Sequence, residues 1–365
     1  MTSKPKAGGD GLLSKTIDFL RFPMIAAVLL IHSNVRSAVV DGRRVGEGGW
    51  PLFNSFDYLV SDVLAGVAVP LFFFISGCLF FRGVPHFTAA VYAAKLRKRV
   101  RTLLIPYVFW NLAVILLLFC GQTFLPELTP GRHKLIADYG FRDWAAAFWN
   151  VDGSGMPVAN PLWFIRDLMV MTVCSPLVWF FVRKLRCFSV LLAGAAWLLL
   201  PFSVPGFSLT AVFFFTAGAF FGIEDIDFAE GLRPGWKLFP LLYLAVTLAV
   251  LYFRSRGIGY GCLLCADILL GMAAAVSLSA HFIAEGKWRP NLFLSKSSFF
   301  IYAYHGLVLG PATLLAVKLL HPHTDGMLIV IYLFVPAVVI GVGLLAYSLL
   351  CRLMPRTTAL VTGGR

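Results

Sequence analysis

The 365-residue chain is too apolar for a soluble protein, since 59% of its residues are hydrophobic, only 13% are charged and the mean hydropathy is +0.82. A globular domain carries roughly twice that share of charge, so the composition excludes a soluble two-domain protein and a disordered chain. The formal net charge of +13 is best explained by basic residues in loops on one side of a membrane, rather than by binding to nucleic acid. The sequence therefore predicts a polytopic membrane protein with no nucleic-acid partner and the lipid bilayer as its surroundings.

Apolar segments recur along the whole chain, and each is expected to be helical because backbone polar groups cannot stay unpaired in lipid. The ten segments span residues 16–35, 57–81, 102–120, 161–182, 188–202, 209–223, 238–253, 261–281, 298–319 and 326–351. The predicted fold class is thus an all-α polytopic membrane protein with about ten transmembrane helices. We expect a single domain over residues 1–365 that begins with a cytoplasmic tail, residues 1–15.

The distribution of lysine and arginine gives the orientation. With the N-terminus in the cytoplasm, 21 of the 31 basic residues fall in cytoplasmic segments and 8 fall outside, while Arg166 and Lys318 lie near the outer ends of their spans. This bias agrees with the positive-inside rule and with an even number of spans. Both termini are therefore predicted to be cytoplasmic, in the inner or plasma membrane of the cell.

One predicted loop is much longer than the others. Residues 121–160 are expected on the extracytoplasmic side, and they contain Trp144 and Trp149. Loops of this length in compact proteins are usually functional or mobile. The segment either covers an outward-facing site or forms a structured cap that binds no ligand.

The first span carries three ionisable side chains. Arg21 and His32 are eleven residues apart, about three helical turns, so both project from one face, and their Cα atoms are separated by about 16 Å along the axis. Asp18 lies three residues before Arg21 and can pair with it. As a neutral imidazole in a low-dielectric pocket, His32 would be a suitable general base for a hydroxyl. The alternative is that Arg21 reaches the headgroups and His32 is an interfacial histidine.

The cytoplasmic segment before the third span holds five basic residues in seven, Lys95 to Arg101. Lys98, Arg99 and Arg101 are candidates for binding phosphate groups, unless the cluster serves only as a topology signal. In the second span, Ser76 precedes Gly77, a pair that either exposes polar groups to a ligand or allows close helix packing.

Further candidates lie in the fourth and ninth spans. Arg166 is adjacent to Asp167, and adjacent residues point about 100° apart on a helix, so they need not pair. Arg166 either supports a substrate or reaches the outer headgroups. Tyr302 and His305 lie within the ninth span, where His305 is either a site residue or a hydrogen-bonded structural histidine. No metal site is predicted.

These motifs together resemble the membrane acyltransferase-3 family. Ile17-Asp-Phe-Leu-Arg-Phe followed by His32 is similar to the Arg-x10-His signature of that family. The other similar motifs are Phe-Phe-Phe-Ile-Ser-Gly at 72–77, Lys98-Arg99 before Leu-Leu-Ile-Pro-Tyr, Leu-Trp-Phe at 162–164 and Ile-Tyr-x-Tyr-His at 301–305. Tyr304 departs from the family, which more often has an aliphatic residue before this histidine.

The resemblance implies transfer of an acyl group, most often acetyl, from cytoplasmic acyl-CoA to a hydroxyl of an extracytoplasmic or lipid-linked glycan. It implies a stand-alone member without a fused SGNH domain, with acetyl-CoA as the donor. Arg21 would orient the donor, and Ser76, Trp163, Arg166, Tyr302 and His305 would support substrate or structure. His32 would act as general base or become transiently acylated.

Two other functions stay open at the level of sequence. A transporter or flippase for a glycan or lipid-linked sugar would also need many spans and buried polar residues, although no internal repeat typical of transporters is visible. A non-catalytic subunit of a polysaccharide-synthesis complex would not require His32. The acceptor sugar, the acyl group and the oligomeric state are not specified by the sequence.

Overall fold

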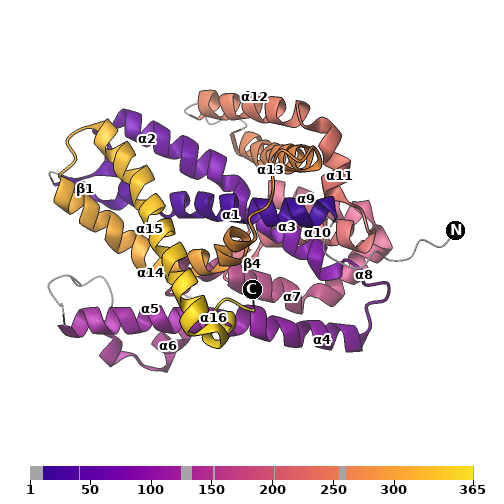
Figure 1. The fold of residues 1–365 in the computed structure, drawn as a ribbon, viewed down its shortest axis with the longest axis horizontal. Coiled ribbons are helices and arrows are strands. Elements are labelled where there is room, and N and C mark those ends of the chain that lie inside the picture. The colour runs from indigo at the N-terminus through magenta and orange to yellow at the C-terminus, as the bar shows by residue number, and fades with distance from the viewer. Residues whose placement is uncertain are drawn as a thin grey trace.

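A computed structural model describes residues 11–40, 42–124, 134–150, 153–200, 202–254 and 260–364. Within these residues nearly all regular structure is helical (Figure 1). The first eight helices are α1 (Leu12–Ile31), α2 (Pro51–Asp57), α3 (Ala68–Phe81), α4 (Ala89–Arg99), α5 (Ile105–Phe124), α6 (Phe141–Phe148), α7 (Trp163–Val173) and α8 (Ser175–Leu185). The remaining eight are α9 (Cys187–Leu199), α10 (Leu209–Ile223), α11 (Phe228–Leu232), α12 (Leu238–Phe253), α13 (Tyr260–Ala284), α14 (Leu292–Leu320), α15 (Asp325–Leu353) and α16 (Pro355–Val361).

Two short antiparallel hairpins are the strands among the described residues: β1 (Val39–Val40) with β2 (Arg43–Arg44), and β3 (Ser203–Val204) with β4 (Phe207–Ser208). Polar residues begin several helices by accepting hydrogen bonds from the free N–H groups of the first turn. Thr88, Ser208, Asn291 and Thr324 cap α4, α10, α14 and α15 in this way.

In the described residues each of the ten predicted apolar segments is largely helical, and the structure supports a multi-pass membrane protein. In the part of the chain that the structure describes, six helical segments are long and apolar enough to cross a membrane: 12–37, 51–81, 89–124, 260–284, 292–320 and 325–353. Two bent pairs, α7 with α8 and α10 with α11, raise the number to eight if each pair is one span. The helices α9 and α12 are shorter, so ten spans and cytoplasmic termini stay predictions.

Two boundaries differ from the sequence prediction. The basic segment before the third span is not a loop, because α4 continues through a π-helical turn, Val100–Leu104, into α5. The fourth span is broken at Cys174, where α7 and α8 meet at a bend of 63°. Pro176 in the first turn of α8 lacks an N–H group, which favours a new helix start at this point.

The long loop predicted over 121–160 is partly helical in its described residues. The helix α5 extends to Phe124, and α6 lies in the later part of the segment. Ile136 and Ala147 pack against Ile115 of α5 in a small buried cluster. The described residues of this segment therefore form a structured cap on α5.

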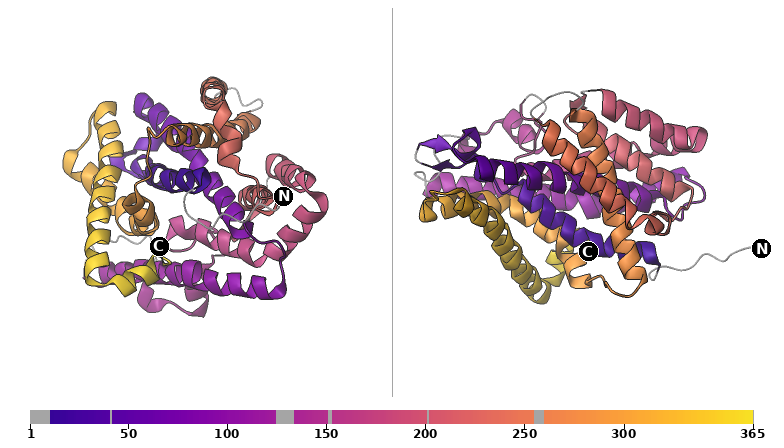
Figure 2. Two further views of the ribbon diagram at one scale, coloured as in Figure 1. Left: turned by 45° about the vertical axis from the view of Figure 1, so that its right-hand side comes forward. Right: turned by 90° about the horizontal axis from the view of Figure 1, so that it is seen from above.

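The helix α1 occupies the centre of the molecule and contacts α3, α13, α14 and α15 (Figures 1 and 2). Beside it, α3 and α10 pack with their backbones almost touching. A Cβ atom added at Gly77 would lie 2.1 Å from the carbonyl oxygen of Phe215, and one at Gly218 would lie 1.9 Å from that of Phe74. The close packing expected as one alternative for Ser76–Gly77 is therefore observed, and Ser76 also lines the cavity described next.

Candidate active site

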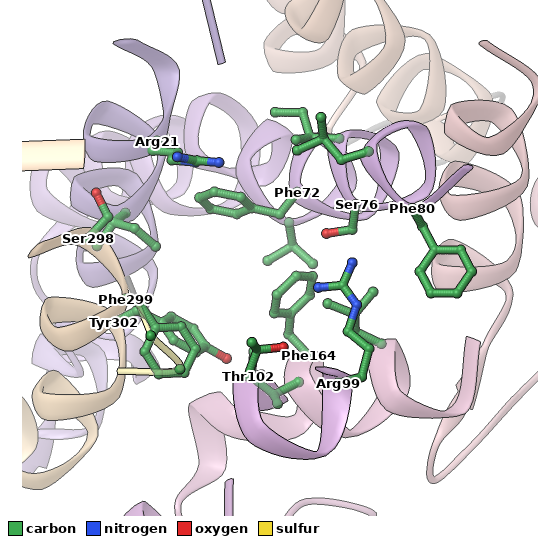
Figure 3. Close-up of a pocket in the computed structure, with 18 of the residues that line it drawn as sticks. Arg21, Phe72, Ser76, Phe80, Arg99, Thr102, Phe164, Ser298, Phe299 and Tyr302 are labelled. Carbon is green, nitrogen blue, oxygen red and sulfur yellow. The ribbon is translucent and has the colours of Figure 1, made fainter. Parts of the chain in front are cut away.

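A cavity of about 430 Å³ opens between α1, α3, α4, α7 and α14 (Figure 3). We call it the cationic cavity, because Arg21, Lys95, Lys98 and Arg99 line it and none of its described lining residues is acidic. The other lining residues are Ile25, Val28, Val69, Phe72, Ile75, Ser76, Leu79, Phe80, Thr102, Phe164, Ile165, Leu168, Ser295, Ser298, Phe299, Tyr302, Gly363 and Gly364. One part of the wall is thus cationic and much of the remainder is apolar or hydroxylated, which suits a ligand with an anionic end and a less polar arm.

The last turns of α4 supply three of the cations. Lys95 donates a hydrogen bond of 2.5 Å to the carbonyl oxygen of Phe80, and Lys95 and Arg99 lie 4.9 and 5.5 Å from the centre of its ring. Thr102 follows on the same helix face, and its buried Oγ1 has no hydrogen-bond partner among the described residues. A buried hydroxyl without a partner is uncommon in proteins and is accounted for if a ligand supplies one.

The structure corrects the predicted membership of this basic cluster. Arg101 is exposed and does not line the cavity, whereas Lys95, which was not singled out from the sequence, does. Lys95, Arg99 and Thr102 follow the i, i+4, i+7 spacing of one helix face. Helical spacing was therefore the signal that separates the residues facing the cavity from the rest of the cluster.

Arg21 is held by a three-way contact between α1 and α14. Its NH1 group donates to Asp18 Oδ1 at 2.6 Å and to Ser295 Oγ at 3.3 Å. The Ser295 hydroxyl in turn donates to Asp18 Oδ1 at 3.0 Å. The predicted Asp18–Arg21 pair is confirmed, but Asp18 does not line the cavity. Asp18 positions Arg21, and Ser295 is a contact that the local sequence could not reveal.

His32 and His305 meet beyond the cavity, with ring centres 5.3 Å apart. His32 ends α1, and its Nδ1 lies 2.9 Å from the carbonyl oxygen of Val28. Because a carbonyl can only accept, Nδ1 must carry the proton, which leaves Nε2 of the neutral ring as a proton acceptor. Neither histidine lines the cavity, but Val28 and Tyr302 do, and the Tyr302 ring is 5.9 Å from that of His305.

His305 lies within α14 and is buried, as either interpretation of this residue requires. It is 1% exposed, and neither ring nitrogen has a partner of normal hydrogen-bond geometry among the described residues. The backbone carbonyls of Ile301 and Tyr302 lie near enough to interact with the ring, but outside that geometry. A buried imidazole in this state is available to a second group, such as a substrate or an acylated His32.

Two other predicted site residues, Trp163 and Arg166, line a separate cavity of about 440 Å³. Arg166 does not reach towards headgroups, because it is only 3% exposed, and it does pair with Asp167, with Nε and NH2 at 3.2 and 3.0 Å from Oδ1. Helix geometry left this pairing open, and the structure shows that the long arginine side chain bends back to its neighbour. We call this second space the ion-pair cavity.

A family model described as an acyltransferase domain matches residues 14–347. The chain belongs to this acyltransferase family. The succinoglycan biosynthesis protein ExoH of Rhizobium meliloti (strain 1021) is 24% identical over 385 residues, which cover 98% of this chain and 94% of the relative. No solved structure matches the chain. The resemblance predicted from the sequence motifs is thereby confirmed.

The matched part of this acyltransferase contains Arg21, His32, His305 and the cations of α4, but not the segment that closes one side of the cationic cavity. Gly363 and Gly364 follow α16 and line that cavity. The indole N–H of Trp110 donates to the carbonyl oxygen of Val361 at 3.0 Å and anchors the segment on α5. The cavity wall therefore includes residues beyond the family match.

Proposed function

We propose that this membrane acyltransferase moves an acyl group, acetyl as the expected one, from cytoplasmic acyl-CoA to a hydroxyl of an extracytoplasmic or lipid-linked glycan in the cell membrane. The observation that carries the proposal is the position of the cationic cavity next to the His32–His305 pair. Coenzyme A has phosphates at one end and a thioester at the other end of a long, largely uncharged arm. The cavity wall has both cationic and apolar residues, which supports a ligand of this kind.

Lys95, Lys98 and Arg99 would bind the phosphates, since charge-assisted hydrogen bonds to phosphate are among the stronger polar contacts in proteins. The unpartnered hydroxyl of Thr102 and the apolar side chains of Phe72 and Phe164 would receive the arm. Arg21, fixed by Asp18 and Ser295, would orient the donor along α1 towards His32. Ser76 and Tyr302 would support the donor from the facing helices.

In the transfer step the acceptor hydroxyl attacks the thioester carbonyl while His32 Nε2 takes the hydroxyl proton. A carbon–oxygen ester bond forms, the carbon–sulfur bond breaks, and the proton passes to the departing thiolate. In the variant step Nε2 itself attacks the thioester, the carbon–sulfur bond breaks, and the Nδ1 proton passes to the departing thiolate. The acceptor hydroxyl then attacks the acyl-histidine, so that an ester forms, the carbon–nitrogen bond breaks and the hydroxyl proton returns to the imidazole. The His305 ring lies beside the His32 ring and would position the His32 imidazole in either scheme.

Family membership favours an enzyme over a flippase or a non-catalytic subunit. The relative is named for succinoglycan biosynthesis, and this supports a glycan as the acceptor here. Titration of the purified protein in lipid nanodiscs with acetyl-CoA, together with an assay of thioester hydrolysis, tests the donor. We expect saturable binding and slow hydrolysis that requires His32. Absence of binding for acetyl-CoA and for longer or charged acyl-CoA would refute the proposal.

A further inference from the structure

The wall of the ion-pair cavity contains the buried ion pair of Arg166 and Asp167, and burial of charge is energetically costly. The Asp167 side chain is 2% exposed and the Arg166 side chain 3%, and burial of two charges is compensated only when they are well paired. Arg166 NH1 also donates to the carbonyl oxygen of Gly155 at 2.6 Å. These contacts use three of the five N–H donors of the guanidinium group, so two donors remain for a ligand.

The charge of this cavity differs from that of the cationic cavity. Arg166 and Asp167 are the charged groups among its described lining residues, and they neutralise each other. The cationic cavity instead has Lys95, Lys98 and Arg99 with no acidic lining residue. An anionic donor is therefore directed to the cationic cavity, and the ion-pair cavity suits a neutral ligand that offers both donors and acceptors.

The remaining wall combines aromatic surface with hydroxyl groups. Trp163 lines the cavity together with Ser203, Ser208 and Thr210, and the Ser208 and Thr210 hydroxyl oxygens accept hydrogen bonds from the Ala211 N–H and the Trp197 indole. Trp149 covers Arg166, with the guanidinium carbon 5.5 Å from the ring centre. Indole surfaces pack against apolar faces, while hydroxyls and a carboxylate exchange hydrogen bonds. A pyranose ring has both kinds of surface.

The helix α7 separates the two cavities. Phe164, Ile165 and Leu168 face the cationic cavity, and Trp163, Arg166 and Asp167 face the ion-pair cavity. In the predicted topology, the cap residues 153–156 and the β3–β4 turn lie on the extracytoplasmic side. The ion-pair cavity is therefore placed where an outside acceptor arrives, on the opposite side of one helix from the donor.

We propose that the ion-pair cavity binds a neutral hexose unit of the acceptor glycan, a conclusion that rests on the proposed acyl-transfer function and specifies its acceptor side. Arg166 and Asp167 hydrogen-bond to sugar hydroxyls, and Trp163 packs against the ring face. These residues are binding residues for the acceptor and take no part in the bond changes.

Saturation-transfer difference NMR on the protein in nanodiscs tests the site directly, with methyl β-D-glucopyranoside and methyl β-D-galactopyranoside as probes and methyl β-D-glucuronide as the anionic comparison. We expect saturable signals from at least one neutral glycoside, weaker signals from the glucuronide, and no displacement by coenzyme A. Trp163→Ala should weaken glycoside binding about tenfold, whereas Trp163→Phe should retain most of it. Trp144→Ala is the matched control, since Trp144 packs on Tyr139 in the cap and lies outside the cavity.

Coenzyme A binding, measured on the same samples, shows that each variant is folded. If Trp163→Ala loses coenzyme A binding as well, Asp167→Asn is compared with the wild-type chain instead. We expect Asp167→Asn to weaken glycoside binding about tenfold too. Three results would overturn the proposal: no glycoside binding, glycoside binding that is unchanged in these variants, or glycoside binding that coenzyme A displaces. Glycoside binding without any acyl transfer would leave this site standing and refute the enzymatic function instead.

Discussion

Replacing Lys95 and Arg99 together by alanine should weaken coenzyme A binding far more than replacing Arg97 and Arg101 together. Both double variants remove two positive charges from the same helical segment. Lys95 and Arg99 are half-buried and line the cationic cavity, whereas Arg97 and Arg101 are exposed and do not line it. The comparison therefore separates direct phosphate binding from the general effect of charge.

The expected loss of coenzyme A affinity follows from the contacts that Lys95 and Arg99 would make with the phosphates. A hydrogen bond to a charged group contributes about 1.5–3 kcal/mol, and we take the lower value because both side chains are partly exposed to solvent. Two such contacts amount to about 3 kcal/mol, or roughly a 100-fold increase in the dissociation constant. The exposed pair acts only through screened charge, so its removal should change the constant by no more than a few-fold.

Isothermal titration of each variant with coenzyme A in nanodiscs, at one fixed salt concentration, measures this difference. Equal losses for the two double variants would show that the basic cluster serves topology or long-range attraction. Unchanged affinity in both would exclude the cationic cavity as the phosphate site. The reasoning from helix face to ligand would then be wrong.

Three further predictions concern His32, the cavity-facing side of α1 and the packing of α10 on α3. His32→Ala should abolish acyl transfer while the protein level stays normal, and transfer within about twofold of wild type would remove both the general-base and the acyl-histidine roles. In a background without native cysteines, Ile25→Cys should react with small polar thiol reagents and Pro23→Cys should not, because only position 25 lines the cavity. Equal protection of both positions would mean that water does not reach this face of α1. Gly218→Ala should destabilise the protein by about 1–3 kcal/mol through collision of α10 with α3, seen as a lower melting temperature than for Gly341→Ala, where a Cβ meets nothing within 4 Å.

The helices and the polar face of α1 could be predicted from the sequence because both depend on local pattern. An apolar segment in lipid has no alternative to helix, and the helical repeat places Arg21, Ile25 and Val28 on one face. All three line the cationic cavity. His32, one further turn along, hydrogen-bonds to Val28 rather than lining the cavity itself.

The partners of these residues could not be predicted, because they come from the other end of the chain. Ser295 contacts Arg21 across 274 positions, and His305 meets His32 across a similar separation. Neither contact leaves a local signal beyond the presence of a polar residue in an apolar segment. The pairing of Arg166 with Asp167 stayed open for a different reason, since helix geometry fixes the direction of Cβ but not the path of a long side chain.

The central claim is that this chain acylates a glycan, and mass spectrometry of cell-surface glycans tests it most directly. Glycans from cells that carry the gene are compared with those from cells that lack it and from cells complemented with His32→Ala. We predict an ester-linked acyl group, removable by mild alkali, that is present only with the wild-type gene. Identical acylation in all three samples would contradict the assignment of this protein as the acyltransferase.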